Sequence, residues 1–166
     1  MIFKQVDEIL SGQKTQTRRV VKPGEGMYEA SLALTAAGNV KWAVGKTYAV
    51  VPKRGLPGVW WKMVGTVALT HNGMHEYHYP SNPDAAAIAL PVTRAELEKR
   101  GFRPLRIRIL AIRQERLQDI TEDDAKAEGV SSKGEYAKLW NRINKRKGTR
   151  WSDNPMVWAL TFEVAK

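Results

Sequence analysis

The sequence contains no cysteine, and this absence excludes several kinds of chemistry. Disulfide bonds, a thiolate nucleophile and any zinc site built on cysteine ligands are ruled out. Long apolar runs are missing too, since none approaches the roughly 18–20 residues that span a bilayer. The chain begins Met1-Ile2-Phe3-Lys4 without the apolar segment of a signal peptide, so we expect a cytoplasmic protein with no membrane partner.

Acidic residues are scarce relative to basic ones: 17 Asp and Glu stand against 27 Lys and Arg, a formal net charge of +10 in 166 residues. Excess positive charge favours polyanions through counterion release, so we expect an anionic or nucleotide-like partner. The clearest basic patch, Lys138–Arg150, holds six basic residues and no acid. It is a possible RNA contact, and the alternative is a solvated helix end followed by a loop.

The length predicts a single domain over residues 1–166. The region 71–101 is rich in Gly, Pro, Asn and His before a short helix, and we interpret it as an insertion. Apolar periodicity and capping residues predict short helices at 4–11, 93–101 and 121–129, and one carrying the stripe Tyr136, Leu139, Trp140 and Ile143. Alternating patterns predict strands at 27–34, 40–44, 47–51, 59–70, 105–109 and 156–164.

Five to six mostly antiparallel strands with three to four short helices, and no long alternation of strand and helix, predict an α+β protein. We expect a small curled sheet or β-barrel decorated by helices. The acids at 119–124 fall in the first turn of a predicted helix, where capping accounts for them, so we expect no metal site there. The three histidines, His71, His75 and His78, are expected in an exposed loop.

The run Lys14–Arg19 is the segment richest in candidate chemistry. It contains two hydroxyls, an amine and two guanidiniums, and no acid. It directly follows a short helix that Gly12 is suited to end. Such side chains suit a phosphate, a carbonyl or a nucleobase, although exposed loop residues would have the same composition.

Several motifs together resemble those of ASCH domains. They are Ser-Gly-x-Lys-Thr-x-Thr-x-Arg at 11–19, Gly-x-x-Tyr-x-Val at 45–50, Leu-Gln-Asp-Ile-Thr at 117–121, and the helix end Glu128-Gly129. ASCH domains belong to the PUA-like superfamily of small β-barrels associated with RNA and modified nucleosides. The resemblance covers most of the chain apart from 71–101, and it implies a PUA-like barrel.

One branch of this family consists of N4-acetylcytidine amidohydrolases, which have a proposed catalytic lysine, threonine and glutamate. The resemblance assigns these to Lys14, Thr17 and Glu128, and the arginine that ends the motif to Arg19. It implies an enzyme without metal or cofactor that removes the acyl group from N4-acylated cytosine nucleosides. Arg18 stands where an apolar residue is usual, and the chain is longer than this branch. The alternatives are an RNA- or modified-nucleobase-binding module without catalysis, or a ribonuclease.

The roles within this set stay open. Lys14 could act as a base if burial and the nearby arginines lower its pKa, with Thr17 as nucleophile or water-orienting group. Glu128 could protonate the leaving nitrogen or orient Lys14. A carboxylate beside Lys14, however, would raise the pKa of the lysine and oppose its use as a base.

Substrate contacts are predicted at five further positions. Arg18 and Arg19 would bind or tune the site, and Lys53 with Arg54, in a loop bounded by glycine, would contact a phosphate or sugar. Trp60 is one of two consecutive strand tryptophans, so one of the two must face outward or into a cleft. A base could stack on it.

Overall fold

The computed structural model describes residues 1, 3, 5–51, 58–64, 67–71, 76–79 and 93–165. The chain divides into two compact units. The first contains Met1–Ser11, Thr47–Ile107 and Val164–Lys166, and the second contains Gly12–Lys46 and Arg108–Glu163. The candidate residues Lys14, Thr17 and Glu128 all belong to the second unit.

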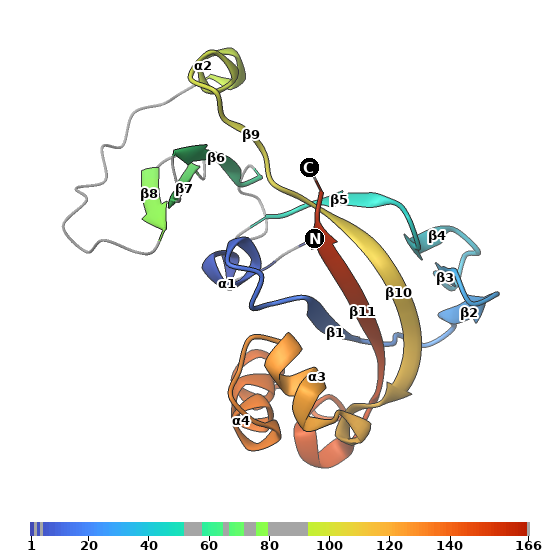
Figure 1. The fold of residues 1–166 in the computed structure, drawn as a ribbon. Helices are drawn as coiled ribbons and strands as arrows, with labels where there is room; N and C mark the ends of the chain where they lie inside the picture. Colours follow the sequence, from blue (N-terminus) through green and yellow to red (C-terminus); the bar gives the residue numbers. More distant parts are fainter. Residues whose placement is uncertain are drawn as a thin grey trace. The chain divides into compact units, whose positions relative to one another are not determined.

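The main sheet of the second unit is built on three long, curved strands. They are β1 (Gln16–Val20), β10 (Arg106–Arg116) and β11 (Met156–Val164). β11 lies between the other two and is antiparallel to β1, with Gln16 opposite Thr161 and Val20 opposite Val157 (Figure 1). The predicted alternation along β10 is confirmed at its start, where Ile107 and Ile109 are buried and Arg108 is exposed. This strand extends to Arg116, well past the predicted end at 109.

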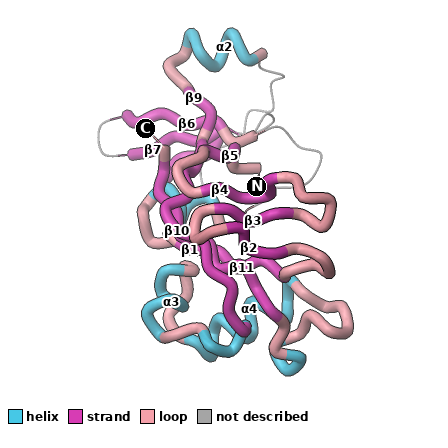
Figure 2. Tube along the Cα trace, turned by 90° about the vertical axis from the view of Figure 1, so that its right-hand side faces the viewer, coloured by secondary structure: helices cyan, strands magenta, loops and turns pink. Residues whose placement is uncertain are grey.

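A second sheet precedes the helices. It is an antiparallel meander of β2 (Gly26–Tyr28), β3 (Leu32–Leu34) and β4 (Val40–Ala43), seen as neighbouring strands in Figure 2. The predicted single strand 27–34 is wrong because the chain turns between β2 and β3, where Glu29 has a φ of 57°. The meander is tied to β11, since Trp158 Nε1 donates to Glu25 Oε2 at 3.0 Å.

The two helices of the second unit are α3 (Glu122–Ala127) and α4 (Lys133–Ile143). The predicted cap of α3 is confirmed: Thr121 Oγ1 accepts from the Asp124 N–H at 3.1 Å. The helices pack in one buried apolar cluster of Leu117, Ile120, Ala125, Tyr136, Trp140 and Val157. The predicted stripe on α4 is wrong at Ile143, which is 49% exposed, because the buried face ends at Trp140.

The first unit holds the remaining elements. They are α1 (Val6–Leu10), β5 (Thr47–Ala49), β6 (Trp60–Val64), β7 (Val67–His71), β8 (Glu76–Tyr79), α2 (Arg94–Lys99) and β9 (Arg103–Pro104). β5 is hydrogen bonded to β10, and a separate sheet has the order β8-β7-β6-β9. The predicted strand 59–70 is wrong, since β6 and β7 are two antiparallel strands with Trp60 opposite His71. His71 and His78 lie in strands and not in a loop, while His75 lies outside the described residues.

The predicted fold class is confirmed at the level of a mixed α+β protein with a curled antiparallel sheet and four α-helices in the described ranges. The predicted count of five to six strands is too low, because short strands raise the number to eleven among the described residues. The described strands form three sheets and no closed barrel. The insertion at 71–101 stays a prediction, since 72–75 and 80–92 lie outside the described residues. Within the described part, no helix is long and apolar enough to cross a membrane.

The cap of α3 gives a first prediction. Thr121→Ala removes the oxygen that accepts from the Asp124 N–H, so it should lower the free energy of unfolding by about 1 kcal/mol. Thr121→Ser keeps that oxygen and should stay close to wild type. Urea denaturation of the three proteins measures the difference, and equal losses for Ala and Ser would contradict the capping role.

Candidate functional site

The residues just before β1 are held between β11 and the end of α3. The Thr15 N–H donates to the Ala127 carbonyl at 2.8 Å, and the Thr15 carbonyl accepts from the Phe162 N–H at 2.8 Å. Lys14 and Glu128 form an isolated antiparallel bridge. These backbone contacts bring together two residues that are 114 positions apart.

The side chains of Lys14 and Glu128 also meet directly. Lys14 Nζ donates to Glu128 Oε2 at 2.8 Å and to the Glu128 carbonyl at 2.6 Å. Both side chains are buried, with exposed fractions of 5% for Lys14 and 4% for Glu128. Lys14 is therefore not an exposed loop residue, and Glu128 is buried beside it.

Arg18 lies on β1 with its side chain fully buried, at 0% exposure. Its Nε donates to Glu115 Oε1 at 2.8 Å, and its Nη2 donates to Asp124 Oδ2 at 2.8 Å. Its Nη1 is 3.3 Å from Glu128 Oε1 and 3.3 Å from Gln16 Oε1. A buried guanidinium is tolerated only when its charge and its N–H groups are matched, and three carboxylates do so here.

Arg113 on β10 supplies a further positive charge for two of these carboxylates. Its Nε donates to Glu115 Oε2 at 2.6 Å, and its Nη2 donates to Asp124 Oδ2 at 2.7 Å. We call the resulting group the ion cluster: Lys14, Arg18, Arg113, Glu115, Asp124 and Glu128. Its three cations face three anions, so the cluster is neutral while its acids are ionised.

The ion cluster shifts the pKa of one of its acids. Burial acts to raise the pKa of Asp124, but hydrogen bonds from Gln16 and Arg113 and the charges of Arg18 and Arg113 outweigh it. The pKa of Asp124 is therefore lowered, and this residue stays ionised to more acidic pH than a free aspartate.

Tyr136 on α4 covers the other side of Glu128. Its hydroxyl donates to Glu128 Oε1 at 3.5 Å, and its ring centroid lies 5.9 Å from the Arg18 guanidinium carbon. Burial, together with the negative charge of Glu128, raises the pKa of Tyr136 well above its usual value. The phenol is therefore neutral and serves as a hydrogen-bond donor to the carboxylate.

Thr17 and Arg19 lie on the face of β1 opposite to Gln16 and Arg18, because side chains alternate along a strand. Thr17 is 5% exposed. Burial lowers the pKa of Arg19, while the negative charge of Glu128 acts to raise it. The ion cluster therefore joins Lys14 to Glu128 directly, whereas the roles of Thr17 and Arg19 stay predictions.

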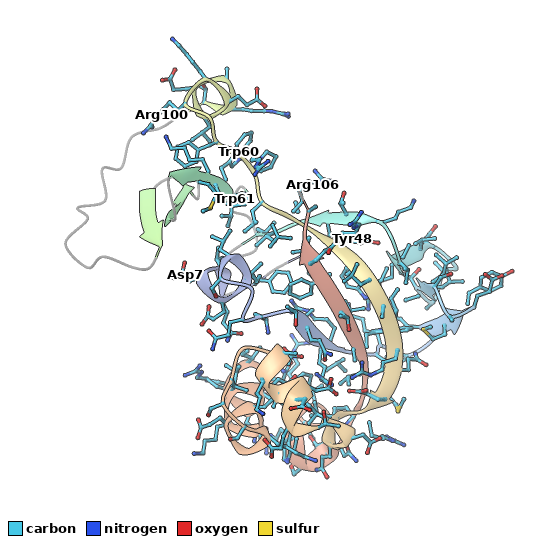
Figure 3. All side chains as sticks on the ribbon, in the orientation of Figure 1. Asp7, Tyr48, Trp60, Trp61, Arg100 and Arg106 are labelled. Carbon is cyan, nitrogen blue, oxygen red and sulfur yellow. The ribbon has the colours of Figure 1, made fainter. Side chains whose placement is uncertain are left out.

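The other predicted contacts lie elsewhere. Lys53 and Arg54 are outside the described residues. Trp60 belongs to the first unit, where it is half-buried with the Arg94 guanidinium carbon 5.9 Å from its ring centroid. Figure 3 shows Trp60 and Trp61 close to the junction of α2 and β9. A stacking role for Trp60 stays a prediction.

Four residues of the site were not predicted from the sequence: Arg113, Glu115, Asp124 and Tyr136. One feature of the sequence could have indicated them. Arg18 stands at a position where the ASCH pattern has an apolar residue. An arginine at such a position would be buried, and a buried arginine requires acids around it. Asp124 was expected only as an acid in the first turn of α3. Within the described ranges no group of three or more His, Asp or Glu is arranged to hold a metal ion.

Comparison with known proteins adds one distant likeness. No family model matches the chain, and no curated protein matches it. Among solved structures, the chain is similar to protein EF3133 from Enterococcus faecalis V583, which is described under the family model DUF984. The TM-score is 0.45 at 13% sequence identity, over 96% of this chain and 68% of that chain. This likeness is too weak to assign a family, and the ASCH resemblance stays a prediction.

The burial of Arg18 predicts a large effect on stability. Arg18→Met leaves the buried Glu128 and the partly buried Glu115 and Asp124 with one cation fewer, so it should lower the free energy of unfolding by about 3–5 kcal/mol. The control is Arg108→Met, which breaks an exposed pair with Glu163 and should cost at most about 1 kcal/mol. Denaturant unfolding measures both, and a loss for Arg18→Met no larger than the control's would contradict the account.

The lowered pKa of Asp124 predicts a pH dependence. Because this pKa lies below that of the unfolded chain, about 3.9, the ionised carboxylate contributes stability above that pH and loses it as the pH falls. The stability difference between wild type and Asp124→Asn should therefore be full at neutral pH and shrink in acid. Asp123→Asn, at a side chain that is 94% exposed, is the control. A wild-type advantage that does not change with pH would contradict this prediction.

Proposed function

We propose that this protein is an ASCH-type amidohydrolase, working without a metal, that removes the acyl group from N4-acylated cytosine nucleosides. One observation supports this most strongly. Lys14 Nζ lies 2.8 Å from Glu128 Oε2, and these are two of the three residues that the ASCH resemblance pairs as catalytic groups. They come from distant parts of the sequence, so their contact depends on the fold.

The proposed reaction is hydrolysis of an exocyclic amide. The oxygen of a water molecule attacks the acyl carbonyl carbon, and the carbonyl oxygen takes up negative charge. The bond from that carbon to N4 then breaks, N4 receives a proton, and cytidine and a carboxylate leave. The chain must therefore supply a group that moves a proton from water to N4, and a positive charge for the oxyanion.

We assign the proton transfer to Glu128. Its carboxylate is held from both sides, by Lys14 at Oε2 and by Arg18 and Tyr136 at Oε1. A carboxylate fixed in this way can accept a proton from water and return it to N4 without a large change of position.

We assign the oxyanion to Lys14. Its amine donates both to a carboxylate and to a backbone carbonyl, and such partners stabilise an ammonium over a neutral amine. This assignment removes the conflict of using a lysine as base beside a glutamate. It leaves Thr17 as a candidate to orient the water, which Thr17→Ser would preserve and Thr17→Val would remove.

Two alternatives make different predictions. The low exposure of Lys14 and Glu128, 5% and 4%, favours an ion pair whose role is structural only. A nucleobase-binding module without catalysis would bind N4-acetylcytidine and leave it intact. Following whether the nucleoside stays intact or is cleaved distinguishes both alternatives from the proposed enzyme.

The test measures the release of cytidine from N4-acetylcytidine by chromatography. Wild type should release cytidine, and Glu128→Gln should reduce turnover by at least about 100-fold because the amide cannot transfer the proton. Glu122→Gln makes the same change at the exposed first residue of α3, and it should keep full activity. Lys14→Gln should lose activity like Glu128→Gln.

Circular dichroism and urea denaturation identify the variants that remain folded. Folded wild type that binds N4-acetylcytidine without releasing cytidine would favour the binding module. Full turnover by folded Glu128→Gln would overturn the catalytic assignment and leave the pair a structural role.

A further inference from the structure

The second unit carries a concentrated positive charge that the candidate site does not use. We call residues 142–150 the basic loop. It contains five basic side chains, all exposed: Arg142, Lys145, Arg146, Lys147 and Arg150. Within the described part of the chain, none of these five forms an ion pair. Lys138 differs, because its Nζ lies 2.8 Å from Glu135 Oε1.

The backbone of the basic loop is fixed from the inside. The buried Trp140 donates its indole N–H to the Thr149 carbonyl at 2.8 Å. Thr149 in turn binds the Arg146 carbonyl twice, through its N–H at 3.1 Å and its hydroxyl at 2.8 Å. The turn is completed by Gly148, whose φ of 80° is a conformation that glycine adopts readily.

The end of the loop is held as well. The Trp151 N–H donates to Asn141 Oδ1 at 2.8 Å, and the Trp151 carbonyl accepts from Gln118 Nε2 at 2.9 Å. Both ends of the loop are therefore attached to the α4 core. A partner that binds here meets charges on a preformed support, and little backbone freedom is lost on binding.

Solubility alone does not explain this arrangement. Two other exposed bases of the same unit have acidic partners: Arg108 pairs with Glu163, and Lys126 pairs with Asp123. The six basic residues of 138–150 are enough to account for six of the ten net positive charges of the chain. Charge that served only to keep the protein in solution would not need to be gathered on one fixed loop.

We propose that the basic loop binds the sugar-phosphate backbone of a nucleic acid. A nucleic-acid strand presents closely spaced phosphate charges, and Lys145, Arg146 and Lys147 present three neighbouring exposed cations that can neutralise them. The inference does not depend on the proposed hydrolysis, and it is tested by binding alone.

The loop also lies near the candidate site. α4 carries Tyr136, which contacts Glu128, and it ends at Ile143, the second residue of the basic loop. Seven residues of helix correspond to about 10 Å. The start of the basic loop therefore lies about 10 Å along α4 from the level of Tyr136.

The experiment measures fluorescence anisotropy of a labelled single-stranded RNA over a series of salt concentrations. The test variant combines Lys145→Gln, Arg146→Gln and Lys147→Gln. The control combines Lys46→Gln, Arg108→Gln and Lys126→Gln, which removes the same charge from exposed residues of the same unit. The loop variant should bind at least tenfold more weakly, and its slope of log affinity against log salt should fall by about 2. The control should keep most of the affinity.

Two further arms complete the design. A DNA strand of the same sequence identifies which nucleic acid is preferred, and tighter binding of either one supports the proposal. Equal losses for both triple variants would overturn it, because net charge and not the loop would then determine affinity. Polyphosphate that competes as well as RNA at equal charge would overturn the assignment to nucleic acid.

Discussion

The buried guanidinium of Arg18 is the constraint on which the second unit depends. A charge at 0% exposure has to be matched inside the protein, and the matching carboxylates come from different elements: Glu115 from β10, Asp124 from α3, and Glu128 from the residue that ends α3. Satisfying one side chain on β1 therefore fixes where the end of β10 and the whole of α3 must lie.

The same constraint fixes the candidate catalytic group. Glu128 has one carboxylate oxygen toward Arg18 and the other toward Lys14, with Tyr136 donating from α4. The glutamate therefore has a single orientation and a matched charge before any substrate binds. We infer that Arg18 acts through Glu128 as a positioning residue, which differs from the direct substrate contact expected from the sequence.

Local chemistry was predictable from the sequence, and long-range partners were not. The caps by Thr121 and Thr93 follow from residues three positions apart, and the alternation around Arg108 follows from strand geometry. The hairpins that break 27–34 and 59–70 were missed because both segments have the apolar content of strands on each side of the turn. The partners of Arg18 lie 97 to 110 residues away, and no local pattern contains that information.

The candidate site was predictable only through the family resemblance. Nothing in the local sequence of Lys14 or Glu128 indicates their contact, whereas the ASCH motifs pair them. The resemblance also names Thr17, which is buried and lies on the face of β1 opposite to Arg18. In the structure, Lys14 donates to Glu128. Arg18 and Tyr136 also donate to Glu128, and Arg113 donates to Asp124.

We propose that the chemistry of this chain takes place at Glu128 beside Lys14. The most direct test is a crystal structure of the Glu128→Gln variant with N4-acetylcytidine bound. We predict that the exocyclic N4 lies within hydrogen-bond distance of the side chain of residue 128, with the acyl oxygen toward Lys14 Nζ. A nucleoside bound away from both residues, with the ion cluster unchanged, would contradict the account.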